Sequence, residues 1–160
     1  MTTSWTAPPL ISPDSHKNLL SYRHDGRKGE TMTRMIVAGG RFFQDYTLLC
    51  SNLDRITAEI PGKIELISGH APGTDSLGER YARERRLRLR VFPARWDLYG
   101  KAAGVLRNQQ MIDYALKRSA IAVFFWDGSS RGTRDAIRRA LKAGIDTRII
   151  RIDEKRGQEK

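Results

Sequence analysis

The sequence predicts an α/β fold, a Rossmann-like three-layer sandwich around a mostly parallel five-stranded sheet. Between residues 34 and 152, short apolar runs of strand length alternate with segments of helical periodicity. Strands that alternate with helices are joined by right-handed crossovers, so the strands lie parallel and helices cover both faces of the sheet. Glycine-rich turns follow three of the apolar runs, at the points where a strand should pass into a helix.

Each predicted helix places apolar residues three or four positions apart, and each predicted strand is a short apolar run. The run 120–126 is the most continuous, which is typical of a central strand buried on both faces. Residues 94–103 show neither pattern and are expected to form a long loop. The expected strands are 34–38, 63–68, 88–92, 120–126 and 147–152, and the expected helices are 45–60, 74–86, 103–118 and 132–143.

The 160 residues suggest one domain with flanking segments. Residues 1–33 are rich in proline, serine, threonine and charge, and are expected to be a disordered N-terminal extension. Residues 34–152 are the expected Rossmann-like domain, and residues 153–160 are a charged tail. The single Cys50 excludes an intramolecular disulfide. No apolar stretch is long enough to cross a bilayer, so we expect a cytoplasmic protein without a membrane partner.

The formal net charge of +11 raises the question of a nucleic-acid partner. The basic residues are spread over several elements and not gathered in one stripe, which favours arginine on solvated faces. The three scattered histidines and one cysteine lack the spacing of a metal site. The first glycine-rich turn is not the full GxGxxG dinucleotide fingerprint, so NAD is not indicated. We therefore expect no metal and no cofactor.

The three glycine-rich turns should meet at one edge of the sheet, because ligands of parallel α/β sheets bind beyond the carboxyl ends of the strands. Glycine lets backbone N–H groups approach a phosphate, and the N-terminus of the following helix attracts anions. A predicted helix adds an arginine and an asparagine at the same edge. The candidate ligand-binding residues are Gly39, Gly40, Arg41, Ser68, Gly69, Gly73, Asp75, Arg107, Asn108, Gly128, Ser129, Gly132 and Thr133.

Several side chains near this edge have two interpretations. Asp75 could accept hydrogen bonds from a ribose or cap the following helix together with Thr74, and capping is slightly favoured. His70 suggests a general base, but a lone histidine in a loop is more often simply exposed. Trp96 and Tyr99 could stack on a base or anchor the long loop to the core.

Together these motifs resemble the YspA-like branch of the SLOG superfamily, which also contains the lonely-guy phosphoribohydrolases and DNA-processing protein A. The resemblance implies a Rossmann-like sheet that binds nucleotides or nucleotide-derived ligands, often in bacterial or phage conflict systems. It also implies that the candidate residues named above except Ser129, together with Asp127, line the pocket. The segments that carry the resemblance are residues 37–41, 43, 45–46, 68–75, 77–78, 92–94, 96, 103–104, 107–108, 111, 125–128, 130 and 132–133.

The lonely-guy enzymes carry a PGGxGTxxE motif, and the position of its glutamate corresponds to Ala136 in this chain. Asp135 is one position away, about 100° around a helix. The resemblance thus predicts a sensor that binds a nucleotide-like small molecule without turnover. The alternative is N-glycosidic cleavage using Asp75, Asp127 or Asp135, with Asp127 as the candidate catalytic residue. A second alternative is a single-stranded nucleic-acid binder, and a homo-oligomer is a further expected partnership.

Overall fold

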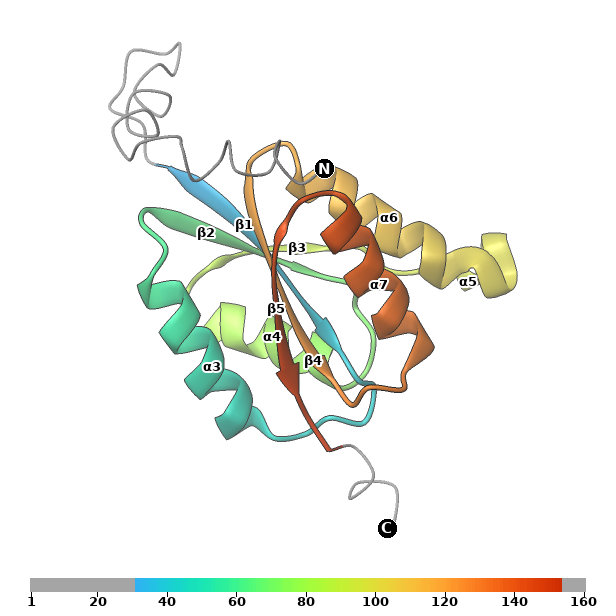
Figure 1. The fold of residues 1–160 in the computed structure, drawn as a ribbon, viewed down its shortest axis with the longest axis horizontal. Helices are drawn as coiled ribbons and strands as arrows, with labels where there is room; N and C mark the ends of the chain where they lie inside the picture. The colour runs from blue at the N-terminus through green and yellow to red at the C-terminus, as the bar shows by residue number, and fades with distance from the viewer. Residues whose placement is uncertain (1–30, 154–160) are drawn as a thin grey trace, which may run out of the picture. The chain divides into compact units, whose positions relative to one another are not determined.

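The computed structural model describes residues 31–153 and contains a five-stranded, all-parallel sheet in the order β3-β2-β1-β4-β5 (Figure 1). This confirms the predicted α/β Rossmann-like arrangement. The residues expected to form a disordered extension, apart from 31–33, and those of the tail beyond Asp153 lie outside the described part of the chain. The strands are β1 (Met32–Gly39), β2 (Lys63–Ser68), β3 (Arg88–Val91), β4 (Ser119–Trp126) and β5 (Asp146–Arg151).

Helices cover both faces of this sheet, with α3 and α4 on one side and α6 and α7 on the other (Figure 1). The first helix begins where the sequence predicts, because the Asp45 carboxylate accepts a hydrogen bond from the Leu48 N–H at 2.9 Å and caps it. The helices are α3 (Tyr46–Ala58), α4 (Thr74–Glu84), α5 (Trp96–Tyr99), α6 (Ala103–Ala115) and α7 (Arg131–Lys142), with a 3₁₀ turn η2 (Gly100–Ala102).

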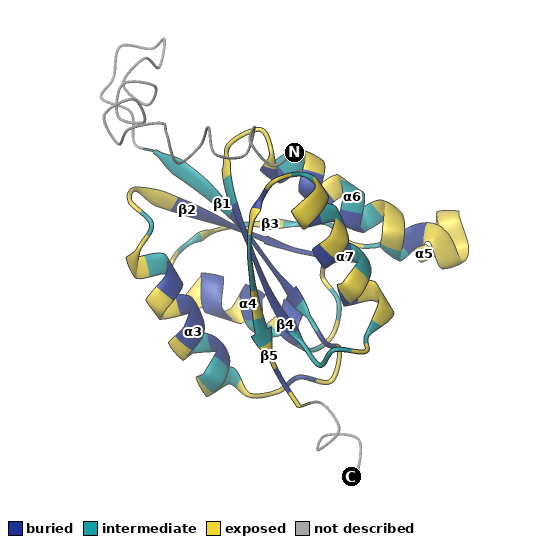
Figure 2. Ribbon diagram, viewed as in Figure 1, coloured by how far each residue is buried: buried dark blue, intermediate teal, exposed yellow. Residues whose placement is uncertain are grey.

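The central strand β1 divides the core into two layers because successive side chains of a strand point to opposite faces. Met35 and Val37 pack with α3 and α4, whereas Ile36 and Ala38 pack with α6 and α7. The neighbouring strand β4 is buried on both faces in the same way, as its continuous apolar run predicts. In Figure 2 the interior strands are largely dark blue, and α5 is exposed throughout.

Two sequence-based expectations need correction. The segment 94–103 is not a plain loop, because it contains α5 and η2 before α6 begins. Four-residue helices are too short to show an amphipathic period, so pattern analysis misses them. Strand β1 also begins at Met32, inside the segment predicted to be disordered, and Thr33 pairs with Ile64 of β2 and Ser119 of β4.

The strand order creates a switch point between β1 and β4. The chain runs outward from β1 to β2 and β3, then returns across the other face to β4 and β5. The connections after β1 and β4 therefore diverge to opposite faces, which leaves a crevice at the carboxyl edge. Among residues 31–153, every helix is too short or too polar to span a lipid bilayer.

The packing of the sheet predicts a large stability effect at Leu66, which is fully buried in β2. Leu66→Ala should lower the free energy of unfolding by about 2–5 kcal/mol, because it removes buried methyl groups and leaves a cavity. The matched control is Leu141→Ala in α7, where the side chain is 57% exposed and a change within about 0.5 kcal/mol is expected. Urea unfolding of both variants measures the difference, and equal losses would contradict the assignment of the core.

Candidate functional site

Two adjoining cavities, each of about 320 Å³, lie at the carboxyl edge of the sheet. The main cavity is lined by the end of β1, the turn before α4, Trp96, and the N-terminal halves of α6 and α7. The side cavity lies between the Gly69–Pro72 turn and residues 93–96. Both volumes fall within the lower range of small-molecule sites. The cavities share Arg41, Ala71, Trp96 and Arg107 in their walls.

The turns that form the main cavity are fixed to one another through Gly40. Its N–H donates to the Phe125 carbonyl of β4 at 3.0 Å, and its carbonyl accepts from both the N–H and the hydroxyl of Thr74, each at 3.0 Å. The ends of β1 and β4 and the start of α4 are thereby held together. A side chain at Gly39 would collide with the Phe125 carbonyl, so glycine is required there for backbone packing.

The two arginines differ in how they are held. The guanidinium of Arg107, on α6, donates to the Gly69 carbonyl and, through Nε, to Asn108 Oδ1 at 3.1 Å. Burial lowers the pKa of Arg107, while nearby Asp75 opposes that effect. Arg41 is exposed, and its guanidinium carbon lies 5.9 Å from the ring centre of Trp96. Arg41 forms no hydrogen bond within residues 31–153, so its donors remain available for an anion.

Asp75 supplies a buried carboxyl to the main cavity and has a side-chain role other than helix capping. It is only 4% exposed, and its Oδ2 accepts the Ala71 N–H at 3.2 Å. Burial raises the pKa of Asp75 to about 6, against the opposing effects of that N–H, Arg107 and Arg41. The expected cap is wrong: Gly73 holds the N-cap position without a side-chain hydrogen bond, and Thr74 bonds to Gly40.

Asn108 joins the two helices that flank the main cavity. Its side-chain amide donates to the Gly132 carbonyl at 3.3 Å and to Asp135 Oδ2 at 3.0 Å, both on α7. The side-chain oxygen of Asn108 accepts the hydrogen bond from Arg107 Nε. Asn108 therefore positions Arg107 and the start of α7, although it also lines the cavity.

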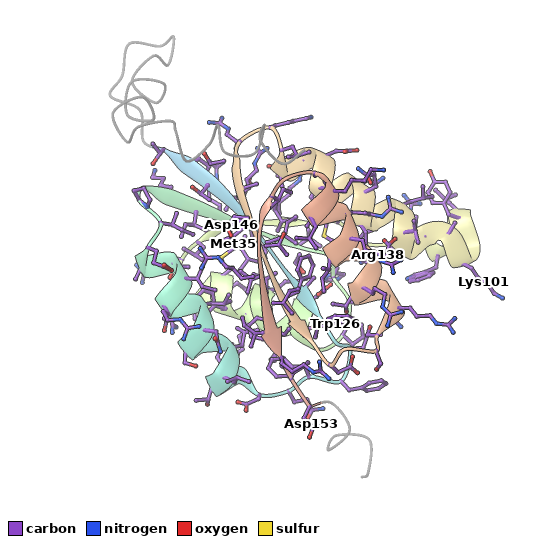
Figure 3. The ribbon with its side chains drawn as sticks, in the orientation of Figure 1. Met35, Lys101, Trp126, Arg138, Asp146 and Asp153 are labelled. Carbon is purple, nitrogen blue, oxygen red and sulfur yellow. The ribbon has the colours of Figure 1, made fainter. Side chains whose placement is uncertain are left out.

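The first turn of α7 faces the main cavity with Arg131, Gly132 and Thr133. Backbone N–H groups in the first turn of a helix have no acceptor within that helix, and together with the helix dipole they favour a bound anion. The Thr133 hydroxyl lies 3.2 Å from the Ser130 hydroxyl, so these two side chains order the turn. Figure 3 shows Arg138 further along α7 and Lys101 beside α5.

The structure brings seven of the candidate ligand-binding residues to the main cavity: Gly39, Arg41, Asp75, Arg107, Asn108, Gly132 and Thr133. Gly69 lines the side cavity instead. Gly40 and Gly73 line neither cavity but serve the packing of the turns, and Gly73 adopts φ +79° beside the backbone of Arg41.

The remaining candidates lie outside both linings. Ser68 is fully buried and donates its hydroxyl to Glu79 Oε2 at 2.7 Å. Gly128 and Ser129 belong to a separate turn, in which the Asp127 carboxylate accepts the Ser129 and Ser130 N–H groups, each at 2.9 Å. Desolvation raises the pKa of Asp127, but these hydrogen bonds outweigh it and lower the pKa overall. Asp127 lines neither of these two cavities, and its role in the site stays a prediction.

The sequence places Asp135 about 100° around the helix from Ala136, yet both residues line the main cavity. The helix meets the cavity with its N-terminal end, so residues on several sides of its first turns are in contact with it. The Asp135 carboxylate is occupied by Arg139 Nε at 2.8 Å and by Asn108. Within residues 31–153, no cluster of three or more histidine, cysteine, aspartate or glutamate side chains is placed to hold a metal ion.

Comparison with known proteins agrees with this architecture. The family model for the YspA, cpYpsA-related SLOG family matches residues 33–99. The Gene 61 protein of Mycobacterium phage D29 is 34% identical over 119 residues, which cover 71% of this chain and 93% of that protein. The chain belongs to the YspA, cpYpsA-related SLOG family. No solved structure matches it.

The raised pKa of Asp75 predicts an unusual dependence of stability on pH. Because the folded-state pKa of about 6 exceeds the ordinary value of 3.8, the folded protein binds more protons between these values, and stability falls as pH rises through them. Asp75→Asn removes this loss. Its stability relative to the wild type should therefore increase by about 2–3 kcal/mol between pH 4 and pH 7.

Urea unfolding at a series of pH values measures this change. Asp97→Asn is the control, because the hydrogen bond from Arg95 lowers the pKa of Asp97 and should give a trend of opposite sign. A pH-independent difference between Asp75→Asn and the wild type would contradict the burial of a titrating carboxyl.

Proposed function

We propose that the main cavity binds a nucleotide or a nucleotide-derived ligand. The observation that carries this proposal is the convergence of Arg41, Arg107 and the first turn of α7 on one cavity at the β1–β4 switch point. These groups form a cationic, donor-rich wall that suits a phosphate. The membership of the chain in a SLOG family supports a nucleotide-related role in coarse terms.

The other walls suit the rest of a nucleotide. Asp75 has a buried carboxyl with one oxygen bonded to the Ala71 N–H, so its second oxygen is available to a sugar hydroxyl. Trp96 is half exposed in the wall shared by the two cavities and offers a ring face for stacking on a base. The proposed orientation therefore has phosphate towards α7 and the arginines, and sugar towards Asp75.

Binding should depend strongly on Arg41. A hydrogen bond to a charged group contributes about 1.5–3 kcal/mol, so Arg41→Ala should weaken binding of AMP or ADP-ribose by about 10- to 100-fold. The unfolding transition without ligand should stay unchanged, because Arg41 is exposed and forms no hydrogen bond within residues 31–153. Thermal-shift titration detects binding, since ligand at a hundred times its dissociation constant stabilises by about 2.7 kcal/mol.

The control for this titration is Arg83→Ala, which removes an exposed arginine of α4 that lines neither cavity. Binding by the control should match the wild type. Equal affinities for the wild type and Arg41→Ala would remove Arg41 from the site, and the absence of any shift with AMP, ADP-ribose or related nucleotides would refute the proposed function.

One observation favours N-glycosidic cleavage as a second candidate. Of the carboxylates considered for that reaction, Asp75 lies in the main cavity with a pKa near 6, a value suited to proton transfer near neutral pH. This chain lacks the glutamate of the lonely-guy motif, because Ala136 occupies the corresponding position.

For this reason we expect binding of AMP without release of adenine. Chromatography of AMP after prolonged incubation with the purified protein tests this expectation. Sustained adenine release that is absent in Asp75→Asn would establish the second candidate and make Asp75 its catalytic group. Release that persists in Asp75→Asn would instead direct attention to Asp127 or Asp135.

A further inference from the structure

A histidine–carboxylate pair lies beside the proposed phosphate-binding groups and has no part in the binding function described above. His70 Nδ1 lies 2.9 Å from Glu79 Oε2, and His70 lines the side cavity together with Arg41 and Arg107. The Glu79 side chain is 9% exposed, whereas the His70 side chain is 58% exposed. A buried carboxylate therefore holds an imidazole that water can reach.

The surrounding hydrogen bonds fix both members of the pair. Glu79 Oε2 also accepts the Ser68 hydroxyl at 2.7 Å, and that hydroxyl oxygen accepts the His70 N–H at 3.0 Å. His70 adopts a left-handed backbone conformation with φ +60°, which is uncommon for a residue with a side chain. The turn thus holds the His70 backbone in an uncommon conformation, with Nδ1 of its ring beside Glu79 and the residue in the wall of the side cavity.

This arrangement determines the chemistry of the imidazole. A carboxylate only accepts hydrogen bonds, so Nδ1 carries the hydrogen that points to Glu79 and the neutral ring keeps its lone pair on Nε2. A base held in one tautomer by a carboxylate is the arrangement found in histidine-dependent hydrolysis. Asp75 and Glu79 lie four residues apart on α4, and the charge of Glu79 contributes to the raised pKa of Asp75.

We propose that His70 and Glu79 form an acid–base dyad that hydrolyses a phosphoester of a nucleotide, an activity that rests on the proposed nucleotide-binding function. The phosphate lies at the wall that the two cavities share, against Arg41 and Arg107, whose charges stabilise the transition state. His70 Nε2 removes a proton from water as the water oxygen forms a bond to phosphorus. The bond from phosphorus to the ester oxygen breaks, its electron pair stays on that oxygen, and the proton passes from His70 to the leaving oxygen.

A phosphorus centre is favoured over other electrophiles because of what shares the side cavity with His70. Arg107 donates to the carbonyl of Gly69, the residue before His70 in the chain. Arg41 lines the same side cavity. Two guanidinium groups beside a base match the charge of a phosphoester and of its transition state. Glu79 does not reach the cavity lining and is therefore a positioning residue.

The p-nitrophenyl ester of thymidine 5′-monophosphate tests the proposal, because its hydrolysis releases coloured nitrophenolate. His70→Gln keeps a side-chain donor for Glu79 but removes the base, and should lower kcat by about 100-fold or more. Binding of thymidine 5′-monophosphate, measured by calorimetry, should be retained in this variant. The thermal unfolding midpoint should also stay the same.

Glu79→Gln should lower kcat and change the ¹⁵N signals of the His70 ring, because the group that fixes its tautomer is lost. The matched control is Glu84→Gln, the same change at an exposed position of the same helix, which should alter neither readout. If Glu79→Gln lowers kcat but leaves the ring signals unchanged, its positioning role is wrong.

The outcomes separate this proposal from the proposed function. If the wild type binds thymidine 5′-monophosphate but releases no nitrophenolate, the dyad is only a structural pair and the binding function stands. If it neither binds thymidine 5′-monophosphate nor hydrolyses the ester, the dyad proposal fails, and the titrations with AMP and ADP-ribose decide the proposed function separately. Hydrolysis that persists at the wild-type rate in His70→Gln overturns the role of His70.

Discussion

The candidate site depends on the junction at Gly40, where the two backbone polar groups of one residue join three elements. Its N–H bonds to Phe125 at the end of β4, and its carbonyl takes two hydrogen bonds from Thr74 at the start of α4. Buried backbone polar groups must find partners, and here the partners come from the elements that surround the cavity. Two glycines allow the backbones to approach this closely. A side chain at Gly39 would collide with the Phe125 carbonyl, and one at Gly73 would collide with the backbone of Arg41.

The junction also explains why Asp75 is buried at a cost to stability. Thr74 is fixed to Gly40, so the next residue of α4 lies in the wall of the main cavity, close to Arg107 and to the Gly69–Pro72 turn. A carboxyl in this position loses most of its contact with water and receives one backbone N–H in return. Such a group weakens the folded state near neutral pH, because burial disfavours its charged form.

The sequence predicted the sheet well because its signals are local. Apolar runs and glycine turns identified all five strands, and the periodicity of residues 46–58 identified α3. The side-chain contacts of the site were harder to predict because they join residues far apart in the chain. Nothing near Ser68 indicates that its hydroxyl would bond to Glu79. The contacts of Asp127 are an exception, because they are local: an aspartate before Gly128 and Ser129 is typical of a turn that its own carboxylate closes. The sequence draws attention to His70, but its hydrogen-bond partner Glu79 lies nine residues later in the chain, on α4.

The turn from Gly69 to Gly73 contacts groups that line each of the two cavities. Its Gly69 carbonyl accepts a hydrogen bond from Arg107, its His70 lines the side cavity, and its Ala71 N–H donates to Asp75 in the main cavity. A Cβ atom at Gly69 would lie 2.6 Å from the guanidinium of Arg107 and 2.9 Å from Asp75 Oδ2. The turn therefore packs too closely against both groups to accept a side chain at this position. The short backbone segment from Gly69 to Gly73 therefore carries contacts to groups in the walls of both cavities.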